Sequence, residues 1–143
     1  MSKAQYPEPV TGAFIFNREN QILLAKSWKW PGDIWSVAGG HIEYGEKIED
    51  AVEREVMEEL GLAVKFQRVI TVLESIFSPN FVKKKHFIFN ECECLLVGEF
   101  RPRYNAEIQE TRWFSLTDAR SLKNLHPAVR TTIEIVDKEQ NAK

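Results

Sequence analysis

The sequence predicts an α/β protein built on a mixed sheet, and three observations support this. Stretches rich in β-branched and aromatic residues alternate with stretches of helical periodicity. No internal repeat, low-complexity run or interdomain linker interrupts the alternation. A chain of 143 residues is long enough to bury a real core in one domain. We therefore expect a single domain over residues 1–143, with flexible ends at about 1–8 and 137–143.

The first third of the chain predicts a hairpin, a loop and a short strand. Residues 10–16 are β-rich, residues 17–20 have turn chemistry, and residues 21–26 return as the second strand. Residues 27–34 form a loop with two tryptophans. The strand at 35–38 then leads into a turn containing Gly39, Gly40 and Gly45.

A helix is expected from about Glu46 to Leu60. Apolar residues recur at helical spacing along it, and Gly61 is suited to its C-terminal cap. The apolar stripe consists of Ile48, Val52, Val56 and Leu60.

The rest of the chain predicts further strands and two helical segments. One or two strands lie within 62–77, and a loop with three consecutive lysines spans 78–85. The longest strand candidate is 86–97, followed by an Arg- and Pro-rich loop at 98–105 and a short strand at 111–114. A helical turn opens at 115–119, and Pro127 suits the first position of a last helix reaching about Val136.

The composition excludes several classes of protein. Hydrophobic residues make up 43% of the chain, and a net charge of −2 gives no support to a general nucleic-acid binder. No apolar run approaches the ~20 residues of a membrane span, and the opening residues lack a signal-peptide pattern. The two cysteines, Cys92 and Cys94, should share one face of a strand and pack as small hydrophobes. We expect a cytoplasmic protein with no stable nucleic-acid or membrane partner.

The predicted helix carries three glutamates close together, Glu55, Glu58 and Glu59. At about 100° per residue they fall within an arc of about 100° beside the apolar stripe, so they should face a cleft near the core. Crowded carboxylates repel one another unless a cation lies among them, and Mg²⁺ prefers such ligands. The simpler interpretation is a solvated acidic face. The glycine turn before the helix, and Arg54 with Glu46 beside the cluster, favour a metal site.

The stretch from Gly40 to Leu62 resembles the signature of the Nudix (MutT-like) hydrolases at every defined position. It reads Gly40, five residues, Glu46, seven residues, then Arg54-Glu55-Val56-Met57-Glu58-Glu59-Leu60-Gly61-Leu62. One departure lies outside it, since many members have proline where this chain has Ala38. The resemblance implies a Nudix-type α/β/α sandwich with a mixed sheet and the box loop and helix packed against it.

The resemblance also implies an activity and a cofactor. Nudix enzymes hydrolyse a nucleoside diphosphate linked to another group X, using Mg²⁺, for which Mn²⁺ can substitute. Glu55, Glu58 and Glu59 are the expected metal ligands, with the backbone carbonyl of Gly39 or Gly40 in the same shell.

The resemblance implies further catalytic roles beside the metal ligands. Arg54, positioned by Glu46, is expected to fix the loop and to contact phosphate, a surface salt bridge being the alternative. The general base is Glu55 or a glutamate outside the signature. Counted back from Trp113, that glutamate is Glu107 or, three residues later, Glu110; both are also explained as exposed loop charges.

Residues outside the signature should select the substrate. Trp28 or Trp30 is expected to stack on a nucleobase, with Phe81 from the later loop nearby. Arg103 and the lysines at 83–85 could add charge for a polyphosphate, although a solvated loop is the simpler explanation.

A small-molecule nucleotide is therefore the expected partner. The favoured substrate is a nucleoside triphosphate cleaved to monophosphate and pyrophosphate, with ADP-ribose or a nucleotide sugar as the alternative. The other class is a Nudix-fold module that senses a nucleotide without cleaving it. Such modules are expected to have lost glutamates of the signature, which are all present here. Many family members pair, so a homodimer is also considered.

Overall fold

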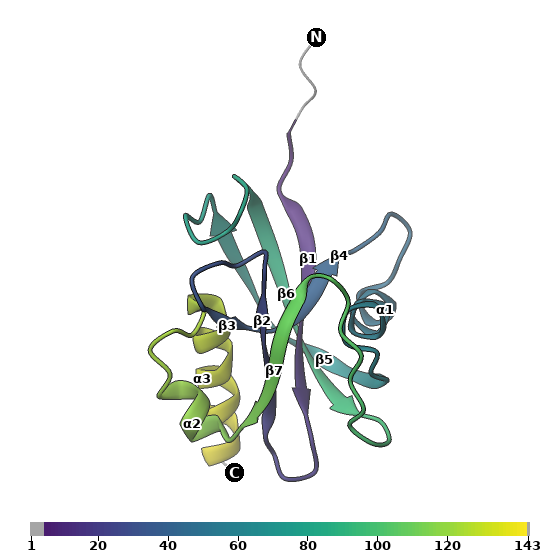
Figure 1. Cartoon of the computed structure of the whole chain (residues 1–143), viewed down its shortest axis with the longest axis vertical. Coiled ribbons are helices and arrows are strands. Elements are labelled where there is room, and N and C mark those ends of the chain that lie inside the picture. Colours follow the sequence, from purple (N-terminus) through teal and green to yellow (C-terminus); the bar gives the residue numbers. More distant parts are fainter. Residues whose placement is uncertain (1–4, 143) are drawn as a thin grey trace.

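A mixed sheet of seven strands forms the centre of the protein in a computed structural model that describes residues 5–142 (Figure 1). The elements are β1 (Glu8–Phe16), β2 (Ile22–Ser27), β3 (Trp35–Ser36), β4 (Ala38–His41), α1 (Ile48–Leu60), β5 (Val64–Ile76), β6 (His86–Leu96), β7 (Ile108–Phe114), α2 (Leu116–Arg120) and α3 (Pro127–Asn141). The main path of the sheet is β3-β2-β1-β6-β5, with β4 joined to β1 and β7 joined to β2.

Helices cover both faces of this sheet. Figure 1 shows α1 on one side and α2 with α3 on the other. Alternate residues of β1 explain why, because Ala13 and Ile15 pack with the α1 core while Phe14 and Phe16 pack with the α2 and α3 core. The expected α/β/α sandwich is confirmed. No helix among residues 5–142 is long and apolar enough to cross a membrane.

Strand β1 organises the centre of the sheet. It runs parallel to β6, with Gly12 opposite Glu91, and antiparallel to β4, with Gly12 opposite Gly39. Cys92 and Cys94 of β6 are both free and buried in the core under α1, as predicted from their spacing. Strands β1, β4 and β6 therefore bring Gly12, Gly39 and Glu91 close together.

The predicted turn at Gly39 and Gly40 is wrong, because both residues belong to β4 and pair with β1. The pairing is so close that a Cβ on Gly39 would lie 1.9 Å from the carbonyl oxygen of Thr11. Only a residue without a side chain fits there, so these glycines permit strand contact. The turn comes later, around Gly45, whose φ is +83°.

The helix of the signature begins at Ile48, two residues later than predicted. Glu46 is not helical because its carboxylate accepts from the backbone N–H of Glu43 and from Arg54, which holds it in the preceding turn. Gly61 caps the helix as expected, with φ +65° and its N–H donating to the carbonyl oxygen of Met57. Residues 62–77 contain one strand, and the strand predicted at 111–114 begins earlier, at Ile108.

The last helix extends further than predicted. It continues to Asn141, so residues 137–141 are helical where a flexible tail was expected. Polar contacts hold this end: Arg120 pairs with Asp137, Arg68 with Glu139, and Asn20 with Gln140. At the other end β1 begins at Glu8. Residues 5–7 have no regular secondary structure, and residues 1–4 and 143 of the expected flexible ends lie outside the described residues.

Candidate active site

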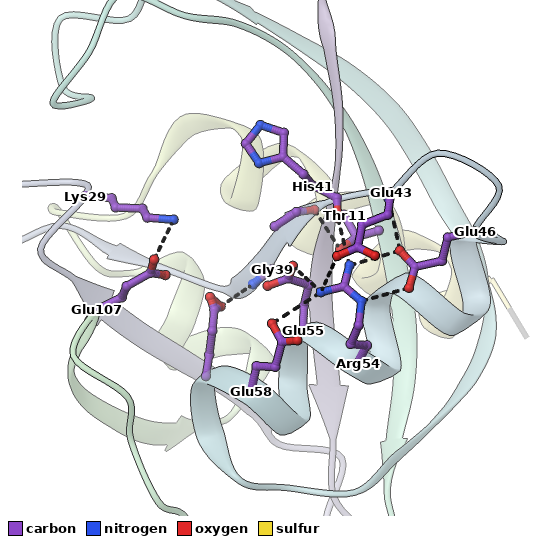
Figure 2. A network of polar contacts seen from close by, with 12 residues as sticks. Thr11, Lys29, Gly39, His41, Glu43, Glu46, Arg54, Glu55, Glu58 and Glu107 are labelled. Carbon is purple, nitrogen blue, oxygen red and sulfur yellow. Dashed lines mark hydrogen bonds and ion pairs between the residues drawn. The ribbon is translucent and has the colours of Figure 1, made fainter.

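Arg54 of α1 is the centre of a network of ion pairs (Figure 2). Its guanidinium donates hydrogen bonds to both carboxylate oxygens of Glu46, at 2.8 and 2.9 Å. It also donates to Glu55 at 2.8 Å and to Glu58 at 3.2 Å. It also donates to the carbonyl oxygen of His41, at the end of β4. Hydrogen bonds from Arg54 hold the pKa of Glu46 well below its usual range, at about 2. Arg54 therefore ties the strand, the turn and the helix together.

The three clustered glutamates have different environments. Glu59 is only 4% exposed, and its Oε1 accepts a hydrogen bond of 2.9 Å from the backbone N–H of Gly39. Burial raises the pKa of Glu59 to about 8, with the nearby charges of Glu55 and Glu107 acting in the same direction. Glu58 is the exposed member, with 56% of its side chain accessible. The carboxylates of this helix thus range from a buried one, Glu59, to a solvent-exposed one, Glu58.

Glu55 lies between these extremes and directly against β4. A Cβ on Gly40 would lie 2.5 Å from its carboxyl group, so the glycine makes room for that carboxyl. Burial raises the pKa of Glu55, and the hydrogen bond from Arg54 opposes the rise. Strand β4 therefore contacts two of the three glutamates, through the amide of Gly39 and the open Cα of Gly40.

Glu107 and Glu110, the candidates outside the signature, have different partners. Glu107 pairs with Lys29 at 2.9 Å (Figure 2), and its carbonyl oxygen accepts from the N–H of Trp28. It lies near enough to Glu59 for its charge to raise the pKa of that carboxyl. Glu110 instead faces Lys26 and Arg112. Of the two, only Glu107 influences the acidic cluster.

A pocket opens beside the acidic cluster. It is walled mainly by aromatic side chains: the ring of Trp30 lies 4.7 Å from Phe81 and 4.4 Å from His126, and that of Phe81 lies 5.0 Å from Phe87. Its lining includes Thr11, Gly12, Lys29, Trp30, Gly39, Gly40, His41, Phe81, Phe87, Phe89, Glu91 and His126. Gly39, Gly40 and Lys29 are shared with the surroundings of the carboxylates, so the two regions are continuous.

The predicted substrate residues do not all reach this pocket. Trp30 and Phe81 line it, whereas Trp28 is 63% exposed and is not among the lining residues. The backbone N–H of Arg103 donates to the carbonyl oxygen of Leu60, which places Arg103 at the far end of α1. Of the three lysines at 83–85, Lys85 pairs with Glu8 and Lys84 lies over the ring of Phe77. Of the four predicted substrate residues, Trp30 and Phe81 line the pocket and Trp28 and Arg103 do not.

Sequence reasoning missed several residues of the pocket. Lys29 and the phenylalanines of β6 carry no local signal, because only the sheet brings them beside the signature. Glu91 did carry one: a glutamate at a core-facing position of a strand is unusual. His126 is the N-cap of α3, where its ring nitrogen accepts from the N–H of Ala128. Burial lowers the pKa of His126 to about 4, so the ring is neutral at pH 7.

The donor set suits a hard divalent cation. Carboxylates that are partly buried and crowded, beside a strand of glycines, are oxygen ligands of the type Mg²⁺ takes. Among residues 5–142, no three histidine, cysteine, aspartate or glutamate side chains converge closely enough to hold an ion as they lie. The contacts explain this, since Arg54 draws Glu55 and Glu58 to itself and the Gly39 amide holds Glu59. A cation bound by all three requires side-chain rearrangement.

The fold and this acidic helix together define a class of hydrolases that act on phosphoric anhydrides. The family model of the NUDIX domain matches residues 7–135, and the chain belongs to the Nudix family. Members of this family generally use divalent metal ions and act on small nucleotides.

Individual relatives agree with this assignment. The chain is 32% identical over 113 residues to the NAD-capped RNA hydrolase NudC of Pseudomonas aeruginosa, a match covering 78% of this chain and 38% of the relative. The chain thus spans about two fifths of the length of that curated relative.

Two solved structures extend the comparison. A MutT Nudix hydrolase from Burkholderia pseudomallei is 30% identical with a TM-score of 0.77, over 92% of this chain and 99% of that chain. An ADP-ribose pyrophosphatase from Streptococcus suis is 28% identical with a TM-score of 0.66, over 96% and 93%.

Proposed function

We propose that this protein is a Mg²⁺-dependent pyrophosphohydrolase of nucleoside diphosphates linked to another group X. The favoured substrate is a nucleoside triphosphate, cleaved to monophosphate and pyrophosphate. One observation carries the proposal: the carboxylates of Glu55 and Glu59 adjoin Gly39 and Gly40, and these glycines also line the aromatic pocket. A nucleotide with its base in the pocket would have its phosphates at the acidic helix.

Glu55, Glu58 and Glu59 would hold the cation, with the backbone carbonyl of Gly40 beside them. A bound Mg²⁺ supplies neutralisation of the pyrophosphate charge and acidification of a water molecule. Arg54 donates to two of these carboxylates, Glu55 and Glu58. If they turned to a bound cation, that part of the guanidinium would be free to contact phosphate. Glu46 would keep Arg54 oriented through its two-oxygen contact.

The environment of the two candidate bases favours Glu55. Glu55 is half-buried against Gly40, a glycine that also lines the pocket, so its carboxyl lies between the acidic helix and the expected position of the nucleotide. Glu107 is instead paired with the ammonium of Lys29. We therefore assign Glu55 the role of general base and Glu107 a supporting role near the metal, as a further acidic group at the entrance.

A second substrate class has a specific observation in its favour. The Streptococcus suis relative, at 28% identity, is named as an ADP-ribose pyrophosphatase. ADP-ribose or a nucleotide sugar shares the pyrophosphate and the base with a nucleoside triphosphate, so the same residues would serve. Capped RNA is a third possibility raised by the curated relatives, although the chain covers 38% of the first of them.

The test is a panel of nucleoside triphosphates, ADP-ribose, nucleotide sugars and dinucleotides, with the products resolved by chromatography. Glu58→Gln and Glu59→Gln should each lower kcat by at least about 10²-fold with Mg²⁺. Glu49→Gln is the matched control, because Glu49 is an exposed glutamate in the first turn of the same helix. Chelation of divalent ions should abolish turnover of the wild type.

Two results would contradict the proposal. Near-wild-type rates in both variants would show that these glutamates are not the metal ligands. Tight nucleotide binding with no product from any member of the panel would instead identify a nucleotide-sensing module.

A further inference from the structure

Glu91 of β6 is a carboxyl group that the proposed chemistry does not use. It is only 2% exposed and lines the aromatic pocket. Its one side-chain hydrogen bond among the described residues is with the hydroxyl of Thr132 on α3, which lies 3.4 Å from Oε2. The described residues give it no cationic partner, so its burial is not compensated by an ion pair.

The contact with Thr132 leaves much of the carboxyl unsatisfied. A hydroxyl has one proton, and that of Thr132 has a better acceptor in the carbonyl oxygen of Ala128, at 2.8 Å. Glu91 Oε1 has no hydrogen-bond partner among residues 5–142. Because Glu91 lines the pocket, this oxygen is free to accept a hydrogen bond from a ligand bound there.

The neighbouring strand makes room for Oε1. Gly12 of β1 lies opposite Glu91 in the parallel pair, and a Cβ on Gly12 would come within 2.3 Å of that oxygen. Gly12 also lines the pocket. The absence of a side chain at position 12 therefore lets the carboxyl oxygen lie at the floor of the pocket.

The surroundings show what kind of ligand Oε1 would meet. Part of the wall consists of the rings of Trp30, Phe81, Phe87 and Phe89, which offer flat apolar surface, and polar side chains such as Ser36 and His126 also line the pocket. Such rings accept a planar ligand, and Oε1 can then accept from a donor on the edge of that ligand. Gly39, Gly40 and Lys29 line the pocket and also adjoin the acidic cluster, so a ring in the pocket and phosphates at the helix can belong to one molecule.

We propose that Glu91 is a specificity-determining residue whose Oε1 accepts a hydrogen bond from the exocyclic amino group of a nucleobase. The inference rests on the proposed function and deepens it. An amino group projects from the ring and carries two donors. The Thr132 hydroxyl donates to Ala128, so the proton of the neutral Glu91 carboxyl lies on Oε2, toward Thr132, and Oε1 acts only as an acceptor. In a keto base the ring N–H is flanked by a carbonyl oxygen, which would face Oε1 and repel it. Amino-bearing bases should therefore be preferred over uracil and hypoxanthine.

The experiment compares ATP with ITP and CTP with UTP. We expect wild-type kcat/KM to favour the amino-bearing member of each pair by at least about 10-fold, because the keto base leaves a buried acceptor unpaired. Glu91→Gln retains an acceptor oxygen and should keep each ratio within about 3-fold. Glu91→Leu removes the acceptor and should bring both ratios close to one. Glu93→Gln, two residues along β6 and outside the pocket lining, is the matched control and should leave them unchanged.

A binding measurement separates this inference from the proposed function. Affinities for the same four nucleotides in the presence of EDTA, followed by tryptophan fluorescence, require no turnover. If none of the four is hydrolysed with Mg²⁺ but the binding preference is present and is lost in Glu91→Leu, the proposed function on nucleoside triphosphates fails and the role of Glu91 stands.

Equal ratios in wild type and Glu91→Leu would overturn the inference, as would a loss of preference in Glu91→Gln as large as that in Glu91→Leu. If Glu91→Leu does not fold, Gly12→Ala replaces it. Its Cβ would displace Oε1 while keeping the carboxyl, and the ratios should fall. Unchanged ratios in that variant would contradict the proposal.

Discussion

At the scale of single residues, Arg54 shows how one side chain can organise a site. Its planar fork meets Glu46 through two parallel hydrogen bonds, and the remaining donors reach Glu55, Glu58 and the carbonyl oxygen of His41. A point charge could balance the carboxylates but could not fix their directions. The guanidinium therefore neutralises these carboxylates and also fixes their positions relative to one another.

Arg54→Lys should consequently behave almost like Arg54→Ala. We expect both variants to lose at least about 10-fold in kcat, because neither can hold Glu46 and Glu55 at once. Steady-state kinetics with Mg²⁺ would measure this, with Arg101→Ala as a control in an exposed loop. Full activity in the lysine variant would mean that charge alone is sufficient.

Glu91 also makes a prediction about stability and pH. Burial raises its pKa to about 8, so between about pH 4.5 and 8 the folded chain holds a proton that the unfolded chain has released. The free energy of unfolding should therefore fall as pH rises through this range. Glu91→Gln cannot ionise and should lose less, by at least about 1 kcal/mol.

Chemical denaturation at pH 5 and pH 8 in EDTA would test this. Both proteins retain the contribution of Glu59, whose pKa is raised in the same way, so the difference between them isolates Glu91. Parallel pH profiles would show that the Glu91 carboxyl has an ordinary pKa in the folded protein.

At the scale of elements, strand β4 joins the sheet to helix α1. One of its glycines is needed for pairing with β1, and the next for the position of Glu55. A Cβ on Gly39 would meet backbone, at 1.9 Å from the carbonyl oxygen of Thr11. A Cβ on Gly40 would meet only the movable end of the Glu55 side chain.

The two alanine substitutions should therefore separate stability from activity. We expect Gly39→Ala to lower the free energy of unfolding by at least about 2 kcal/mol, since the strands must move apart. Gly40→Ala should cost less than about 1 kcal/mol yet reduce kcat at least about 10-fold, because Glu55 is displaced. Thermal unfolding and kinetics on both variants would check this. A stable, active Gly39→Ala would contradict the close pairing.

At the scale of the whole molecule, α3 closes the face of the sheet opposite α1. Its buried residues Val129, Ile133 and Val136 complete the second core, while its last turn is held by polar contacts with Arg68 and Arg120. Figure 1 places the last turn of α3 at the opposite end of the molecule from the start of β1. Among the described residues, none beyond Val129 lines the pocket.

A chain ending at Val136 should consequently lose some stability and no activity. Exposed ion pairs contribute little, so the expected loss is about 1 kcal/mol. Urea denaturation and kcat/KM on the favoured substrate would test this. A fall in kcat/KM much larger than the loss of stability explains would show that the last turn influences the site.

Much of the fold could be predicted locally. The period of the apolar residues located the helix of the signature, and Gly61 marked its end. Its start was misplaced because Glu46 is a good helix former that the Arg54 contact holds in a turn. The glycine turn was wrong for a similar reason, since close pairing with β1 places Gly39 and Gly40 in a strand. The helical end of α3 was missed because its partners, Asn20, Arg68 and Arg120, are distant in sequence.

The sequence by itself determined the class of this protein, because the glycines, the arginine and the glutamates of the signature lie within one short stretch. The arginine and three of the glutamates share one helix, so their spacing in the sequence sets their spacing in the folded protein. The tertiary structure alone decided which other residues join them. Trp30, Phe81 and Glu91 come from a loop, a second loop and a strand, and reach one pocket only through the pairing of β1 with β4 and β6. Chemistry within one helix can be recognised from its spacing. A pocket built across a sheet cannot, because its neighbours are set by strand pairing between distant segments.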